Sequence, residues 1–195
     1  MPRKPAAEPR PYGKKGWTDK EPVYSLWRKY IPKFSWYSET KMDNDLIYFS
    51  AMPLAEAVKL FQLMPETCQE QNVQNGDLTM LELLNLASPG SLVHGYVVRK
   101  ERADERISFE GLFVPEAEAA PVLCELINNN WIPDNCDLGI YRAIWDNGEL
   151  IESRTWEAEP DGDLSDYWKE YTNYFKDRPR TPLAECPKMY RLWWD

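Results

Sequence analysis

The chain lacks the residue patterns on which most metal sites and nucleophilic active sites are built. It contains one histidine, His94, and no C-x-x-C pair among its four cysteines. Structural zinc sites usually combine closely spaced ligands, so we expect no metal site. The nine glycines are scattered and form no glycine-rich phosphate loop, so we also expect no cofactor. The four cysteines are Cys68, Cys124, Cys136 and Cys186.

Long apolar segments are missing as well. No run approaches the roughly 18 apolar residues of a membrane-spanning helix. The first residues, Met1-Pro-Arg-Lys-Pro5, contain no apolar stretch of the kind that a secretory signal requires. Without such a signal, the cysteines are expected to remain reduced thiols. The sequence therefore predicts a cytoplasmic protein with no membrane partner.

Aromatic and charged side chains are abundant, and the charge is divided unevenly. Hydrophobic residues make up 43% of the 195 residues, with nine Trp, eleven Tyr and six Phe, which is sufficient for one folded domain. Residues 1–34 carry nine Lys and Arg against three acids, a charge of +6. Because the whole chain is −9, the remaining 161 residues carry −15. We interpret residues 1–34 as a basic, proline-rich arm whose end packs on the body, and residues 35–195 as a single acidic α+β domain.

Local signals divide the chain into strands and helices. Residues 1–22 hold five prolines and two glycines, which predicts an extended segment. Asn147-Gly148 is a strong signal for a two-residue hairpin turn. The expected elements are a short helix 22–30, a strand 46–51, helices 53–64 and 78–87 (the latter capped by Asp77), strands 92–100 and 106–114, a helix 116–129 that either starts late or kinks because of Pro121, hairpin strands 138–146 and 149–157, a helix 164–177, and a proline-broken tail.

The order of these elements predicts an α+β fold of ferredoxin-like type. Its split β-α-β unit would carry a helical insertion, an added edge strand from the hairpin, and a C-terminal helix. Two stretches, Phe49–Ala57 and Gly111–Ala119, each pass from a strand through a proline into Ala-Glu-Ala. This weak internal repeat fits the same arrangement, although two copies of common helix formers also arise by chance.

Aromatic residues on the central strands of such a sheet could stack on RNA bases. Tyr48, Phe49, Phe109 and Phe113 fall on the appropriate strands. The basic residue and the glycine spacing of the RNA-binding signature are absent, and a body of charge −15 repels phosphate. We therefore expect these rings to belong to the core.

Two further motifs have ordinary structural explanations. Residues 157–168 place carboxylates and a glycine as a calcium loop does, but Trp168 stands where a bidentate Glu is required, which favours an acidic turn. His94 lies within an expected strand, where a packed and hydrogen-bonded histidine is commoner than a catalytic one.

The acidic run between residues 146 and 166 is the strongest functional signal. The run contains eight carboxylates and one basic residue, Arg154. Trp145 and Trp156 lie next to these acids in the sequence. Such a run is either a solvated surface or a binding site for a basic partner, in which tryptophan supplies the anchors. The residues predicted to bind the partner are Asp146, Glu149, Glu152, Trp156, Glu157, Glu159, Asp161, Asp163, Asp166, Trp193 and Trp194.

The sequence favours a non-catalytic binding protein of the inhibitor, immunity, anti-defence or adaptor type, docked on a basic macromolecule. One alternative is a structural subunit whose arm contacts nucleic acid or a neighbouring subunit through Arg3, Lys4, Arg10, Lys14 and Lys15. A less favoured alternative is an enzyme whose site is assembled from scattered carboxylates. The oligomeric state is left open.

Overall fold

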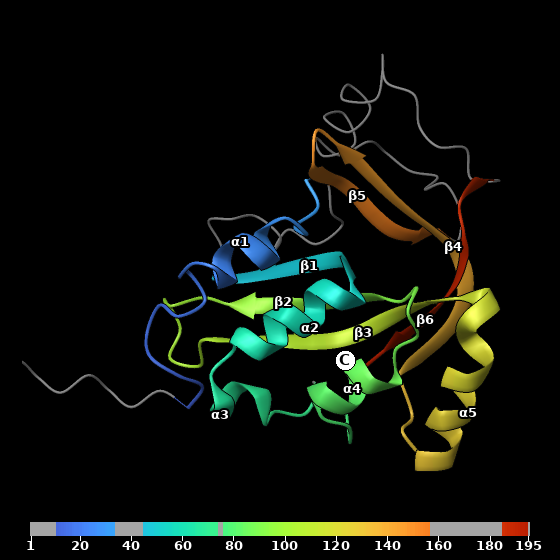
Figure 1. Ribbon diagram of the computed structural model, residues 1–195, viewed down its shortest axis with the longest axis horizontal. Helices are drawn as coiled ribbons and strands as arrows, with labels where there is room; N and C mark the ends of the chain where they lie inside the picture. The colour runs from blue at the N-terminus through green and yellow to red at the C-terminus, as the bar shows by residue number, and fades with distance from the viewer. Residues whose placement is uncertain (1–10, 34–44, 74–75, 157–184, 195) are drawn as a thin grey trace, which may run out of the picture.

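A mixed α+β architecture is built around one six-stranded antiparallel sheet (Figure 1). The computed structural model describes residues 11–33, 45–73, 76–156 and 185–194. The strands lie in the order β1-β2-β3-β6-β4-β5. The elements are α1 (Val23–Arg28), β1 (Leu46–Pro53), α2 (Leu54–Leu63), α3 (Glu66–Gln69), α4 (Met80–Leu86), β2 (Leu92–Val98), β3 (Arg106–Pro115), the 3-10 helix η2 (Glu116–Glu118), α5 (Ala119–Asn129), β4 (Asn135–Asp146), β5 (Glu149–Trp156) and β6 (Lys188–Trp193).

The split β-α-β arrangement is not found. It would require a third strand between β1 and β2, but these two strands pair directly and antiparallel, with Tyr48 opposite Tyr96. Residues 188–193, which the sequence predicts as part of a proline-broken tail, form β6. This strand lies between β3 and β4 and pairs with both. The α+β class is confirmed, and the topology differs because a strand from the far end of the chain enters the middle of the sheet.

Helices cover one face of the sheet and enclose the main core. Helix α2 follows Pro53, whose missing N–H needs no helical partner at this position, and it buries Ala57, Leu60 and Phe61. Helix α4 begins after Thr79, which forms a capping box with Glu82, so Asp77 is not the cap. The expected helix 164–177 lies outside the described residues. No helix in the described part of the chain is long and apolar enough to cross a bilayer.

Residues 11–33 fold against this core. The side chains of Trp17 and Trp27 are buried, and the indole N–H of Trp27 donates to the carbonyl of Thr18 at 2.9 Å. The buried carboxylate of Glu105 accepts hydrogen bonds from the backbone N–H of Gly16 and from the N–H and hydroxyl of Thr18. Residues 11–22 are therefore turns that pack on the β2–β3 connection, and the extended conformation predicted for 1–22 is wrong for this part.

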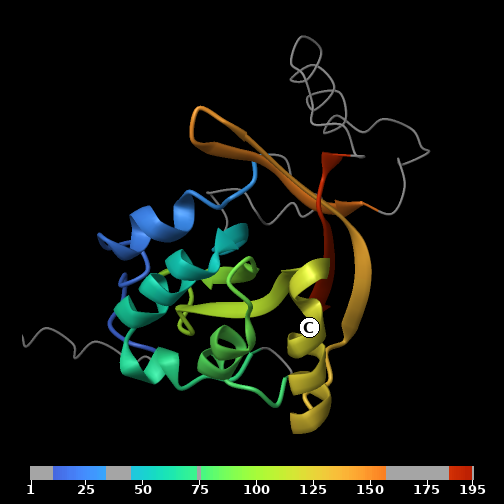
Figure 2. The same cartoon turned by 45° about the vertical axis from the view of Figure 1, so that its right-hand side comes forward.

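The sheet curls toward its opposite face until the edge strands β1 and β5 meet. The sheet is therefore nearly barrel-shaped. Figure 2 shows the β4–β5 hairpin reaching back toward α1. The hydroxyl oxygens of Ser50 on β1 and Ser153 on β5 lie 2.6 Å apart. The segment after α1 spans the same gap, because Lys33 N–H donates to the carbonyl of Leu150 at 2.9 Å and Ser50 N–H donates to that of Tyr30 at 2.8 Å. A second small core fills the concave side with Ala51, Phe113, Tyr141, Leu150 and Met189.

Candidate functional site

The tip of the β4–β5 hairpin places an exposed tryptophan beside two acids. Asn147 and Gly148 have φ values of 50° and 81°, the left-handed pair that a tight hairpin turn requires. Asp146 and Glu149 face each other across the first pair of the ladder. Trp145 is 44% exposed, and its ring stands edge-on to that of Tyr30 at 5.8 Å between centroids. We call Trp145, Asp146 and Glu149 the hairpin tip.

The structure brings only part of the predicted acidic site together. Glu152 is buried and forms an ion pair of 2.9 Å with the equally buried Arg142, so it stabilises the hairpin and presents no charge to a partner. Trp156 ends β5 opposite Ile140, and its side chain is outside the described part. The remaining predicted acids also lie outside the described residues: Glu157, Glu159, Asp161, Asp163 and Asp166.

The two tryptophans at the end of the chain have different surroundings. Trp194 is 1% exposed and belongs to the helix-side core, and its backbone N–H donates to the carbonyl of Glu110 at 2.9 Å. It is therefore not available as an anchor for a partner. Trp193 is half-buried on the other face, with the guanidinium carbon of Arg191 5.1 Å from its ring centroid.

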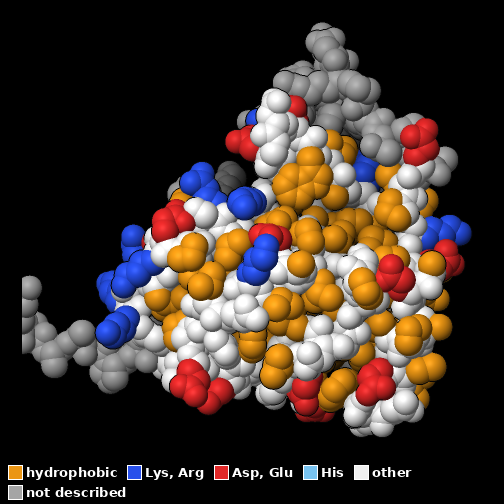
Figure 3. Space-filling model, viewed as in Figure 1, with side chains coloured by type: hydrophobic (Ala, Val, Ile, Leu, Met, Phe, Trp, Pro, Cys, Tyr) orange, Lys and Arg blue, Asp and Glu red, His pale blue; other side chains and the backbone are white. Residues whose placement is uncertain are grey.

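Basic side chains are exposed along residues 11–33. Of the predicted arm contacts, Lys14 and Lys15 are exposed, whereas Arg3, Lys4 and Arg10 lie outside the described residues. Figure 3 shows Lys and Arg gathered at the edge of the molecule over α1. The exposed bases of this segment are Lys14, Lys15, Lys20, Arg28, Lys29 and Lys33.

The four aromatic residues weighed as an RNA-binding set do not form one exposed surface. Phe49 and Phe109 are buried in the helix-side core, where their rings meet at 6.2 Å. Phe113 is buried in the second core. Tyr48 is half-buried against Tyr96. The expectation that these rings serve packing agrees with their burial.

A chain of side-chain hydrogen bonds crosses the concave side of the sheet. His94 Nδ1 lies 2.6 Å from Ser50 Oγ, which is 2.6 Å from Ser153 Oγ, and Ser153 Oγ is in turn 2.6 Å from the hydroxyl of Tyr141. The four residues come from β2, β1, β5 and β4. We call this the hydroxyl chain. Sequence analysis missed it because Ser50 and Ser153 belong to no local pattern.

His94 is buried among aromatic rings. The centroid of its ring is 4.0 Å from that of Phe113 and 6.1 Å from that of Trp193. Its Nε2 atom is buried and has no hydrogen-bond partner. Burial, with a smaller contribution from the charge of Arg191, holds the pKa of this imidazole well below its usual 6.5, so the ring is neutral at pH 7.

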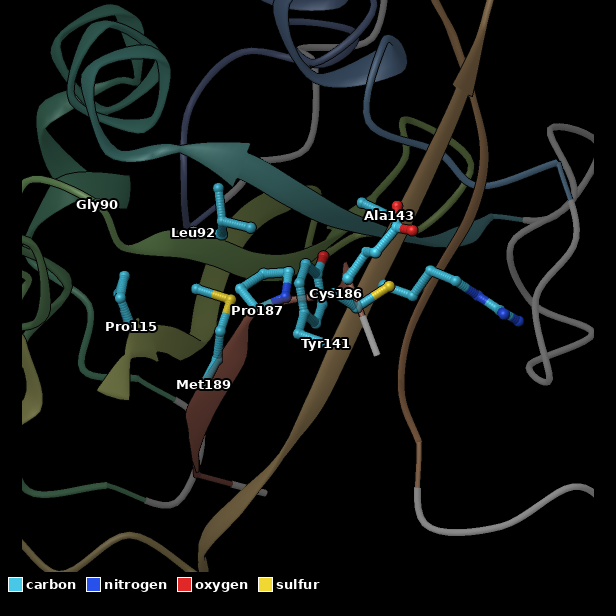
Figure 4. Close-up of a pocket in the computed structure, with 10 residues that line it drawn as sticks. Gly90, Leu92, Pro115, Tyr141, Ala143, Cys186, Pro187 and Met189 are labelled. Carbon is cyan, nitrogen blue, oxygen red and sulfur yellow. The ribbon is translucent and has the colours of Figure 1, made fainter. Parts of the chain in front are cut away.

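A cavity of about 330 Å³ adjoins the second core (Figure 4). Its walls are mainly apolar, and Tyr141 links it to the hydroxyl chain. Cys186 lies at its side, but burial raises the pKa of this thiol, so it is not activated as a nucleophile. The described residues contain no group of His, Cys, Asp or Glu able to hold a metal ion. The lining residues are Gly90, Leu92, Pro115, Tyr141, Arg142, Ala143, Glu185, Cys186, Pro187 and Met189.

Comparisons with models of protein families, with curated proteins and with solved structures find no match to this chain. The hairpin tip offers an anchor flanked by negative charge at the surface, whereas the hydroxyl chain and the cavity lie in the concave interior.

Proposed function

We propose that this chain is a non-catalytic binding protein that docks on a basic macromolecule through the hairpin tip. The observation that supports this proposal is the exposure of Trp145 next to the two carboxylates that flank a tight turn. Exposed tryptophans are favoured interface anchors because they bury a large apolar area. Neighbouring carboxylates attract a basic partner and speed the encounter. A cytoplasmic inhibitor, immunity protein, anti-defence protein or adaptor fits this description.

Charge reversal at the tip tests the proposal. The chain would be affinity-tagged, purified from its native host at moderate salt, and its stoichiometric partner identified. We then expect the double variant Asp146→Lys/Glu149→Lys to bind that partner roughly tenfold or more weakly, with a flatter dependence on salt, because the screened attraction is lost. Glu116→Lys/Glu125→Lys, which reverses two exposed acids on η2 and α5, is the matched control.

Trp145→Ala separates anchoring from electrostatics. Truncation of an interface anchor costs about 1 kcal/mol or more and acts mainly on dissociation. Intact binding in both Trp145→Ala and the tip double variant, together with a folded hairpin, would exclude the hairpin tip as the docking site.

The exposed bases of residues 11–33 favour a second candidate function, a structural subunit that contacts nucleic acid or a neighbouring subunit. Because residues 11–22 pack on the body, this contact would use a fixed basic surface and not a loose arm. Replacing Lys14, Lys15 and Lys20 by Gln should abolish assembly in that case, with the melting temperature unchanged. Assembly that survives this change would rule out the basic surface as the contact.

A further inference from the structure

The edge strands β1 and β5 meet without forming a ladder in the described part of the chain. They are joined by the Ser50–Ser153 hydroxyl contact and by the two backbone hydrogen bonds of the segment Tyr30–Lys33. We call this junction the β1–β5 seam. Across this junction the described strands form no ladder, and local opening costs less where fewer backbone hydrogen bonds between strands are lost.

When Nδ1 of His94 carries no hydrogen, the three hydroxyl hydrogens of the hydroxyl chain can fill its three contacts. Tyr141 can donate to Ser153, Ser153 to Ser50, and Ser50 to Nδ1 of His94. The remaining hydrogen of the neutral ring then lies on Nε2, which has no partner. The hydrogen bonds of the hydroxyl chain thus depend on the protonation state of the His94 ring.

Protonation of His94 removes this match between the hydrogens and the contacts of the hydroxyl chain. Nδ1 then carries a hydrogen of its own, so four hydrogens compete for three contacts and one of them loses its acceptor. A buried donor without an acceptor is costly, and a buried cation without a counter-charge costs more. The seam is where these costs can be relieved, because its opening admits water to Ser50 and His94.

The groups facing His94 give an imidazolium no compensation. They are Ser50 from β1, Phe113 from β3, Tyr141 from β4, Ser153 from β5, and Arg191 and Trp193 from β6. The only charged side chain among them, Arg191, is itself a cation. No carboxylate of the described residues forms an ion pair with the ring.

We propose that the β1–β5 seam is an acid-sensitive latch, in which protonation of His94 breaks the hydroxyl chain and frees the β4–β5 hairpin from β1. Above pH 6.5 the ring is neutral in both the closed and the open state, and the seam is closed. Below pH 6.5 only the open state takes up the proton readily, so the equilibrium shifts toward opening by up to tenfold for each pH unit. Opening of the seam requires no partner.

Amide hydrogen exchange measures the latch directly. Ser50 N–H and Lys33 N–H close the seam, whereas Tyr96 and Ser108 pair within the β2–β3 ladder. After correction for intrinsic exchange rates, protection at Ser50 and Lys33 should fall by up to about 30-fold between pH 7.5 and 5.0. Protection at the amides of Tyr96 and Ser108 should fall much less. Equal loss at all four amides would indicate global unfolding and overturn the proposal, as would unchanged protection at Ser50 and Lys33.

The variant His94→Asn is the matched control, since its amide can meet Ser50 but cannot titrate in this range. Its seam protection should not depend on pH, and a fall equal to that of the wild type would overturn the proposal. A second measurement needs only wild type and Ser153→Ala. His94 is the one histidine of the chain, so its imidazole nitrogen signals are unambiguous in NMR. Ser153→Ala weakens the seam and should move the His94 titration to higher pH. An unchanged midpoint would contradict the latch.

Discussion

The hydroxyl oxygens of Ser50 and Ser153 lie 2.6 Å apart, although the two residues are separated by 103 positions in the chain. This contact joins the first and last strands of the sheet order and closes the concave side. Each oxygen has a further partner, His94 for Ser50 and Tyr141 for Ser153. The curvature of the sheet is thus held by a few polar groups whose removal has separable effects.

Ser153→Ala should destabilise the protein more than Tyr141→Phe. The first change leaves the buried hydroxyl of Tyr141 without its Ser153 partner, and a stranded buried hydroxyl costs about 1–3 kcal/mol, whereas the half-buried Ser50 keeps His94 as a partner. The second removes one terminal hydroxyl and should cost only about 0.5–1.5 kcal/mol. Urea unfolding of the two variants gives the order, and an equal cost would show that the chain does not act as a connected unit.

The stability of the fold should decrease in mild acid because of His94. Its pKa is lowered in the folded protein, so the unfolded chain binds the proton first as the pH falls through 6.5. The stabilisation is therefore complete above pH 6.5 and is lost below it, by up to about 1.4 kcal/mol for each pH unit. The difference between wild type and His94→Asn in unfolding free energy, measured from pH 7.5 to 5.0, isolates this effect from the carboxylates. A difference independent of pH would contradict it.

Neutralisation of Glu152 should destabilise the protein far more than neutralisation of Glu149. Glu152→Gln removes the carboxylate that pairs with the buried guanidinium of Arg142, and breaking a buried pair costs about 3–5 kcal/mol. Glu149→Gln changes an exposed side chain and should alter stability by less than about 0.5 kcal/mol. Thermal unfolding compares the two directly. Equal stability of the variants would place Glu152 on the surface with the other acids.

Glu105→Ala should detach residues 12–19 from the body. The carboxylate accepts three hydrogen bonds from Gly16 and Thr18, and its loss leaves buried donors unsatisfied. Trypsin would then cut after Lys14, Lys15 and Lys20 faster than in the wild type, whereas Glu101→Ala, an exposed acid of the same turn, should leave the rate unchanged. Resistance of Glu105→Ala to cleavage would show that other contacts hold the segment.

Gly148→Ala isolates the backbone requirement of the hairpin turn. A methyl group at this position would meet no atom within 4 Å, so its only cost is the φ of 81°. That conformation costs a non-glycine residue about 1–2 kcal/mol, and the loss should appear in chemical denaturation. The same substitution at Gly95 would place a methyl group 2.0 Å from the carbonyl oxygen of Ser108 and should be far more damaging. Comparable losses at both sites would contradict this distinction.

Local sequence signals predicted the turns and helix starts that depend only on neighbouring residues. Asn147-Gly148 forms the turn, and the helices after Pro53 and Pro115 start near their prolines. Strand β6 was not predicted because its pairing partners, β3 and β4, lie more than 40 residues away in sequence. The prediction that Glu152 belongs to an exposed acidic site was wrong for a related reason. Strand residues alternate between faces, and Glu152 turns inward to meet Arg142 whereas Glu149 remains at the tip.

Strand β6 also decides when this chain can finish folding during its synthesis. β3 and β4 leave the ribosome long before residues 188–193, yet β6 must lie between them. The nascent chain therefore exposes two unpaired strand edges until residues 188–193 emerge, which is the period when a molecular chaperone would protect it. A chain cut short after residue 185 would lack β6 and a complete sheet, and cellular proteases would meet an open structure.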